Sequence, residues 1–290
     1  MEFRKEYLDA FHIIPFTDVP DSLPERYFRI DAGGADPETD DPFFAVFSKN
    51  SFLRVLKAGY EPVLLIAKNH TKYTYLMETV RADCPKLPVC LIPCEGGSAD
   101  CPGGAVYGFD RFGLSALFRK KPLPPLSVIL RPAKKVAVFR GFGHTEKELQ
   151  ELGPQIRSAV ALGADAVLLQ AGMVDPFDRF LVRITLGTHF LLPFALYESD
   201  EELFRALDEN GFSRVLIFPG KTEGASLLAD TDIRSSRIAL ISDHSIQKGQ
   251  APDPALSFDT GVYVRSRPFP GKAPCLTSIA LYSLFSKDLT

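Results

Sequence analysis

The fold is decided by the stretch from Gly153 to Pro193, GPQIRSAVALGADAVLLQAGMVDPFDRFLVRITLGTHFLLP. Its pattern predicts a helix, a strand, a loop, a second helix and a second strand. Gly153-Pro154 opens the first helix, because proline is well tolerated in a first turn, and Gly163 ends it. The short apolar run Ala166–Leu169 is typical of a strand buried on both faces of a parallel sheet.

The second helix of this stretch starts at the turn Asp175–Asp178 and ends near Gly187. Each of the two helices carries one arginine, Arg157 and Arg183, among apolar residues. A buried guanidinium is costly unless an acidic group, a helix C-terminus or an anionic ligand pairs with it. We therefore expect each arginine to have such a partner, and Glu151 is one candidate for Arg157.

The same alternation of strands and helices continues towards the C-terminus. The strands are expected at Val136–Phe139, Arg214–Phe218, Arg237–Ile241 and Gly261–Val264, and the helices at Glu201–Asn210 and Cys275–Phe285. This order indicates an α/β domain with a parallel sheet. Gly141-Phe142-Gly143 follows the first of these strands, but Glu146 interrupts the dinucleotide-binding fingerprint.

An α/β pattern also precedes the deciding stretch. Its strands are expected at Phe43–Phe47, Glu61–Ala67 and Pro88–Ile92, and its helices at Ser51–Gly59 and Tyr73–Ala82. We predict an N-terminal extension over residues 1–40 with a short helix at Asp21–Ile30, a first domain over 41–120, a stiff proline-rich linker over 121–135 and a second domain over 136–290.

Composition sets bounds on the class of protein. Apolar residues make up 46% of the 290 residues and charged residues 24%, which suits two ordinary globular domains. The net charge of -3 shows no basic excess, so composition alone does not predict a nucleic-acid partner. No apolar run is long enough to span a membrane and the N-terminus is unlike a signal peptide, so we expect a cytoplasmic protein.

The cysteines do not predict a metal site. Four of the five cluster in one region, Cys84, Cys90, Cys94 and Cys101, but their gaps do not form a pair of C-x-x-C knuckles. Free thiols in a reducing compartment are the expected state.

The deciding stretch resembles a known family. The matching residues are Gly153, Arg157, Ser158 and Ala159 in a motif N-x-G-x-x-x-R-(S/T)-A, then Arg183, Thr185 and Gly187 in R-x-S-x-G before Pro193. These are signatures of the SpoU/TrmH family of SPOUT-superfamily RNA ribose 2′-O-methyltransferases. Glu151 stands where that family has asparagine.

The resemblance implies a particular architecture and reaction. The C-terminal parallel-sheet domain would be a SPOUT domain with a trefoil knot, joined to a smaller N-terminal α/β domain that binds the RNA substrate. The chain would form a homodimer, with two subunits completing each site. It would transfer a methyl group from S-adenosylmethionine to rRNA or tRNA.

The resemblance also assigns roles to residues of this sequence. Arg157 and Glu151 would be the catalytic positions, with the planar Arg157 fork suited to a phosphate or an oxyanion. The cofactor-binding residues would be Phe218, Pro219, Gly220, Ile241, Ser242, Asp243, His244, Val264, Leu276 and Thr277. The RNA-binding residues would be Arg183, Arg119, Lys120 and Lys121.

Two later motifs depart from the family pattern. The second, roughly G-(N/S)-E-G-x-G, corresponds to the stretch Ser242–Gly249, in which the glycines and the glutamate of the motif are gone, so Cβ atoms would crowd the cofactor. The third has lost its proline and asparagine, at Val264-Arg265 and Cys275–Thr277. An inactive, RNA-binding dimer of the same fold is therefore the alternative. Ser242-Asp243-His244 does not predict a hydrolase triad, because adjacent loop residues rarely converge in space.

Overall fold

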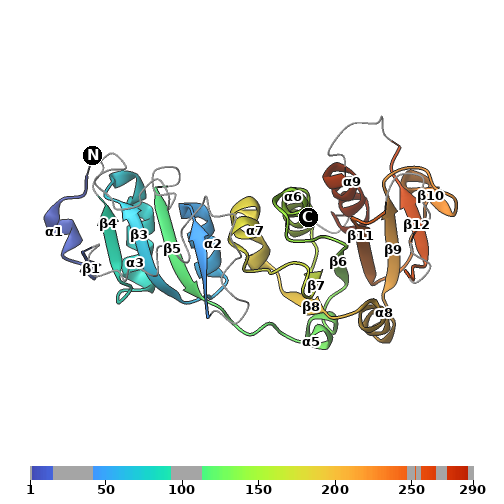
Figure 1. Ribbon diagram of the computed structural model, residues 1–290, viewed down its shortest axis with the longest axis horizontal. Helices are drawn as coiled ribbons and strands as arrows, with labels where there is room; N and C mark the ends of the chain where they lie inside the picture. Colours follow the sequence, from blue (N-terminus) through green and yellow to red (C-terminus); the bar gives the residue numbers. More distant parts are fainter. Residues whose placement is uncertain are drawn as a thin grey trace. The chain divides into compact units, whose positions relative to one another are not determined.

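The computed structural model describes residues 2–15, 42–92, 113–246, 252, 256–265 and 273–286. The chain divides into two compact units (Figure 1). Unit 1 comprises Met1–Lys121 and Phe177–Gly187, and unit 2 comprises Pro122–Pro176 and Thr188–Thr290. The chain therefore leaves unit 2 after Pro176 and returns to it at Thr188.

Unit 1 is built on a mixed sheet with the strand order β1-β4-β3-β5-β2. Its strands are β1 (Ile13–Ile14), β2 (Phe43–Phe47), β3 (Pro62–Lys68), β4 (Val89–Ile92) and β5 (Leu114–Arg119). Its helices are α1 (Lys5–Leu8), α2 (Lys49–Lys57), the 3-10 turn η3 (Thr71–Tyr73), α3 (Thr74–Asp83) and α7 (Arg179–Thr185). The three strands and two helices expected from the sequence of this region are confirmed.

Two strands of unit 1 were not expected. β1, in the N-terminal extension, pairs parallel with β4, and β5 lies antiparallel between β3 and β2. The run of β5 is almost entirely buried, because it is a central strand with a neighbour on each side. The helix expected at Asp21–Ile30 lies outside the described residues.

Unit 2 is built on a parallel sheet with the strand order β10-β12-β9-β11-β6-β7-β8. Its strands are β6 (Lys135–Arg140), β7 (Ala166–Gln170), β8 (Phe194–Tyr197), β9 (Ser213–Phe218), β10 (Ala225–Leu227), β11 (Ile238–Asp243) and β12 (Thr260–Tyr263). Every strand pair in this sheet is parallel, which confirms the predicted α/β fold with a parallel sheet.

Helices cover both faces of the unit 2 sheet (Figure 1). The helices are α5 (Leu126–Leu130), α6 (Glu146–Ala161), α8 (Asp200–Glu209) and α9 (Ala273–Phe285), with the 3-10 turns η4 (Thr188–Leu191) and η5 (Leu228–Asp230). α6 packs against α9 on one face, and α5 packs against α8 on the other. Because helices cover both faces of the sheet, the strand residues are buried on both sides, and their sequences are continuous apolar runs.

Helix α6 starts seven residues before the expected Gly153-Pro154, at Glu146. Thr145 caps it in a capping box with Glu148, a signal that the sequence analysis missed. Pro154 therefore lies inside the helix, where it is exposed, so water can reach the carbonyl group that loses its amide partner. The expected end is confirmed, because α6 stops at Ala161 before Gly163, which has φ +88.

Two other expectations need correction. The segment 121–135 was predicted to be an extended linker, but it contains α5, whose Leu126 and Leu130 are buried in the core of unit 2. The strand expected before Pro193 is the 3-10 turn η4, and β8 follows the proline. Among the described residues, none of the helices has the length and apolar character needed to cross a bilayer.

Candidate functional site at the carboxyl edge of the unit 2 sheet

Four neighbouring strands of unit 2 end at the same edge of the sheet. Tyr263 of β12 is paired with Phe218 of β9, and Asp243 of β11 is paired with Arg140 of β6. Because the strands are parallel, the loops that follow them lie together beyond this edge. Ligands of open α/β sheets bind at such carboxyl edges.

Side chains at the end of β11 alternate between the two faces of the sheet, as in any strand. Ser242 and His244 face α6, where they contact Gln155 and Glu151. Asp243 faces the α8 side, where it pairs with Arg140. Successive residues of one short segment therefore belong to two separate polar networks.

The first network has the amide of Gln155 at its centre. The hydroxyl groups of Ser242 and Thr277 both donate to Oε1 of Gln155, at 2.7 Å each. Nε2 of Gln155 donates to the carbonyl of Glu151 at 3.0 Å. All three side chains are buried, so these bonds tie α6, β11 and α9 together. The hydroxyl groups of Ser242 and Thr277 thus point into the protein.

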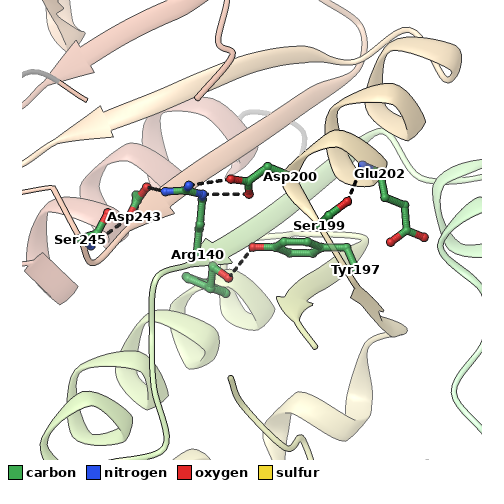
Figure 2. A network of polar contacts seen from close by, with 8 residues as sticks. Arg140, Tyr197, Ser199, Asp200, Glu202, Asp243 and Ser245 are labelled. Atoms are coloured by element: carbon green, nitrogen blue, oxygen red, sulfur yellow. Dashed lines mark hydrogen bonds and ion pairs between the residues drawn. The ribbon is translucent and has the colours of Figure 1, made fainter. Parts of the chain in front are cut away.

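The second network surrounds Arg140 (Figure 2). Its guanidinium donates to both carboxylate oxygens of Asp200, at 2.9 and 2.6 Å, and to Oδ2 of Asp243. The Asp243 side chain has no exposed surface, and the Arg140 side chain is 13% exposed. The hydrogen bonds that Arg140 donates to Asp200 outweigh the desolvation and raise the pKa of Arg140. Burial raises the pKa of the neighbouring Tyr197, whose hydroxyl donates to the Phe139 carbonyl at 3.4 Å.

The loops after β6 and β11 approach each other closely beside Asp243. The backbone N–H and the hydroxyl of Ser245 donate to Oδ1 of Asp243, at 2.8 and 2.6 Å. Gly141 has φ +70, and a Cβ there would lie 2.9 Å from the same carboxylate oxygen and 3.1 Å from the Ser245 nitrogen. Only glycine fits this position without strain. The turn that carries His244 is therefore fixed by the hydrogen bonds between Ser245 and Asp243 and by the close approach of Gly141.

His244 lies between α6 and an aromatic ring. Its backbone N–H donates to the Arg140 carbonyl at 2.9 Å, which continues the pairing of β11 with β6. Nδ1 lies 3.5 Å from Oε2 of Glu151, and the ring stacks on Phe142 with centroids 4.8 Å apart. The side chains of His244 and Glu151 are 29% and 28% exposed, so solvent reaches the pair.

A polar stripe on α6 supplies most of these partners. Glu148, Glu151, Gln155 and Ser158 are spaced by three or four residues, so they share one helix face. Ser158 adds a hydrogen bond of 2.7 Å to Ser278 of α9. Gln155 was not predicted from the sequence, although its spacing from Glu151 places both residues on this stripe.

Arg157 does not behave as expected from the sequence. It is exposed on α6, and the described residues include no ion-pair partner for it. Glu151 lies six positions earlier, which places it on a different helix face, and pairs with His244 instead. The premise that Arg157 is buried in an apolar helix is therefore wrong, because the apolar residues of α6 face the sheet while Arg157 is exposed.

The remaining residues predicted to bind the cofactor come from the same edge and from α9. Phe218, Gly220, Ile241 and Leu276 are buried, while Pro219 and Val264 are half-buried. Phe218 and Ile241 are the last or nearly last residues of β9 and β11. The predicted cofactor-binding residues are thus grouped around the ends of β9, β11 and β12 and the start of α9.

The residues predicted to bind RNA all belong to unit 1. Arg119 pairs with Glu61 at 2.9 Å. Lys120 lies over the ring of Phe177, Lys121 over Tyr60 and Arg183 over Phe180, at 5.4, 4.9 and 4.5 Å from the ring centroids. The rings of Tyr60 and Phe177 are themselves 6.1 Å apart, so the two lysines share one aromatic cluster.

The described residues contain no group of three His, Cys, Asp or Glu side chains arranged to hold a metal ion. Cys84 is half-buried, Cys90 buried and Cys275 exposed, and all three are free thiols. Cys94 and Cys101 lie outside the described residues.

No protein-family model matches the chain. Two tRNA/rRNA methyltransferases described as uncharacterized, from Mycobacterium bovis and Mycobacterium tuberculosis, are 30% identical to it over 149 residues. That alignment covers 51% of this chain and 50% of each relative, so the chain spans about half the length of the curated relatives it matches.

Solved structures extend the similarity to nearly the whole chain. An rRNA methyltransferase from Sinorhizobium meliloti with bound AdoMet has a TM-score of 0.69 at 18% identity, covering 94% of this chain and 97% of that one. A SpoU methyltransferase from Streptomyces viridochromogenes in complex with AdoMet has a TM-score of 0.64 at 17% identity, covering 89% and 95%. The resemblance to the SpoU/TrmH family is confirmed, because the chain is similar in sequence to tRNA/rRNA methyltransferases and shares the fold of SpoU methyltransferases.

Proposed function

We propose that the chain is an RNA 2′-O-ribose methyltransferase that uses S-adenosylmethionine and acts on rRNA or tRNA. The observation that carries this proposal is the fold shared with an AdoMet-bound rRNA methyltransferase over 94% of the chain. The sequence similarity to tRNA/rRNA methyltransferases points to the same reaction. We further propose that the protein acts in the cytoplasm.

The residues at the carboxyl edge fit S-adenosylmethionine. Its role when bound is to supply an activated methyl group. The cofactor would be held mainly by backbone groups of Phe218–Gly220, Ile241–His244 and Val264, with Leu276 and Thr277 at the start of α9. Ser242 stands where the family pattern has glycine and Asp243 where it has asparagine or serine, yet both side chains turn into the protein. This arrangement supports a ligand that meets the backbone of these loops.

The same observation bears on the alternative of an inactive RNA-binding dimer. That alternative requires the altered side chains to crowd the cofactor site. Ser242 donates to Gln155, and the Asp243 side chain is wholly buried against Arg140 and Ser245. The active enzyme is therefore the proposal that the geometry favours.

We assign different roles to the two units. Unit 2 would carry the methyl-transfer site and the trefoil knot, formed where the segment from β11 to α9 passes the neighbouring strands. Unit 1 would bind RNA, with Arg119, Lys120, Lys121 and Arg183 contacting phosphates. The charged groups of three of these cations lie over aromatic rings, which attract them.

Arg157 would act on the RNA and not on the cofactor. Its guanidinium is exposed and therefore able to reach a phosphate or the ribose of a bound substrate. Glu151 is on another face of α6 and pairs with His244. In a dimer that completes each site from two subunits, Arg157 would serve the site of the other copy.

We expect the protein to form a homodimer through the α9 region. Ile279 and Tyr282 are large apolar side chains on α9 and are 44% and 64% exposed. A second copy that packs on this helix would cover them. Analytical ultracentrifugation should give a dimer at micromolar concentration, and Ile279→Glu should shift it towards monomer. A stable wild-type monomer would contradict this expectation.

Titration with S-adenosylmethionine tests the proposed function directly. Isothermal calorimetry should show binding by the wild type. Incubation with methyl-labelled cofactor and unmodified rRNA and tRNA transcripts should then give 2′-O-methylated nucleosides, identified by mass spectrometry after nuclease digestion. Absence of cofactor binding by folded protein would favour the inactive alternative, and methylation of a base would refute the ribose assignment.

A further inference from the structure

The proposed reaction requires a group that accepts a proton, and this inference rests on the proposed function. A ribose hydroxyl is a weak nucleophile until a base takes its proton. Arg157 is poorly suited to that task, because a guanidinium stays protonated in proteins and has no acceptor atom. The acceptor should therefore be another side chain beside the carboxyl edge of the sheet.

His244 has the surroundings of such an acceptor. It follows β11 directly, at the edge where the loops that would hold the cofactor meet. Its Nδ1 faces the Glu151 carboxylate at 3.5 Å, and one ring face is covered by Phe142. Nδ1 is the ring nitrogen that contacts Glu151, and among the described residues none forms a hydrogen bond with Nε2. The His244 side chain is 29% exposed, so a substrate can approach the ring.

We propose that His244 accepts the proton of the ribose 2′-hydroxyl, with Glu151 as the positioning residue that orients its ring. The ribose oxygen forms a bond to the methyl carbon while the bond from that carbon to sulfur breaks and leaves its electron pair on sulfur. The hydroxyl proton passes to Nε2 of His244. Glu151 holds the proton on Nδ1 and stabilises the imidazolium that forms, as a carboxylate does for a histidine base.

Other charges near the ring agree with this assignment. Glu148 lies one helical turn before Glu151 on the same face of α6. Its negative charge interacts with His244 and favours the protonated ring. The hydrogen bond from the Thr145 hydroxyl is the main cause that lowers the pKa of Glu148, so this carboxylate is ionised at neutral pH. Arg140 contributes only its carbonyl here, because its guanidinium faces the opposite side of the sheet. The imidazolium would thus form beside two carboxylates.

Substitution of His244 gives the kinetic test. His244→Gln should lower kcat by about 10²- to 10⁴-fold, the usual loss when a general base is removed. Calorimetric affinity for S-adenosylmethionine and for an rRNA or tRNA transcript should stay unchanged. His144→Gln is the matched control, since His144 is an exposed histidine of the loop between β6 and α6 and should be replaceable without loss.

The pH profile separates a base from a merely structural residue. Wild-type kcat should fall as acid protonates an imidazole base, and this acidic limb should be absent from the residual activity of His244→Gln. Glu151→Gln should lower kcat less than His244→Gln does and keep the acidic limb. Unchanged kcat and an unchanged profile in His244→Gln would overturn the assignment.

A measurement on the free protein tests the same point without turnover. Nitrogen-15 NMR of the histidine rings should show that the neutral form of the His244 ring carries its proton on Nδ1, facing Glu151, and leaves Nε2 without a proton. The resonance is identified by its loss in His244→Gln. A proton on Nε2 would refute the proposal. If the wild type binds RNA but transfers no methyl group, the proposed function is refuted. If the wild type and His244→Gln are equally active, only the role of His244 is refuted.

Discussion

Replacing Arg140 with methionine should destabilise unit 2 by about 3–5 kcal/mol, the cost of leaving a buried charge without its partner. The Asp243 carboxylate has no exposed surface, and Arg140 is the cation that neutralises it. Methionine fills a similar volume but carries no charge. Urea unfolding monitored by circular dichroism would measure the difference in the free energy of unfolding.

A second substitution shows whether the buried charge is the cause. Asp243→Asn in the Arg140→Met background should recover part of the lost stability, because the amide carries no charge, and a double-mutant cycle would give the coupling energy. Arg119→Met is the control, since the exposed pair Arg119–Glu61 should be worth about 1 kcal/mol or less. Equal effects of Arg140→Met and Arg119→Met would contradict the importance of burial.

Arg157→Ala should lower methyl transfer by about 10²- to 10³-fold, the range seen when one charge-stabilising donor is lost from a transition state. Stability should stay the same, because the side chain is exposed and the described residues offer it no ion pair. Affinity for S-adenosylmethionine should also stay unchanged, since Arg157 would act on ribose and phosphate. Labelled methyl transfer and calorimetry would measure the two effects.

Two further variants sharpen the result for Arg157. Arg157→Lys should recover part of the turnover, because lysine keeps the charge but lacks the planar fork that holds two oxygens. Arg205→Ala, an exposed arginine on α8, should leave transfer unchanged. Loss of cofactor binding in Arg157→Ala would refute this role and make Arg157 a cofactor ligand.

Local patterns in the sequence were sufficient to predict most of the helices and strands. The apolar run Ala166–Leu169 predicted β7, Gly163 predicted the end of α6, and Asp178 caps α7 through a hydrogen bond of 2.6 Å to the Leu181 N–H. These predictions succeed because burial on both strand faces, positive φ and helix capping each depend on a few consecutive residues. The start of α6 failed because Pro154 was given more weight than the capping box at Thr145.

The sequence by itself therefore determined the α/β class, the parallel sheet and the family resemblance. Only the tertiary structure decided which polar residues meet. Arg140 joins Asp200 and Asp243, which are 60 and 103 positions away, because β11 lies beside β6 and α8 begins at the same edge. Likewise His244, and not Arg157, meets Glu151. Strand order depends on the packing of the whole chain, so no pattern within a short stretch contains it.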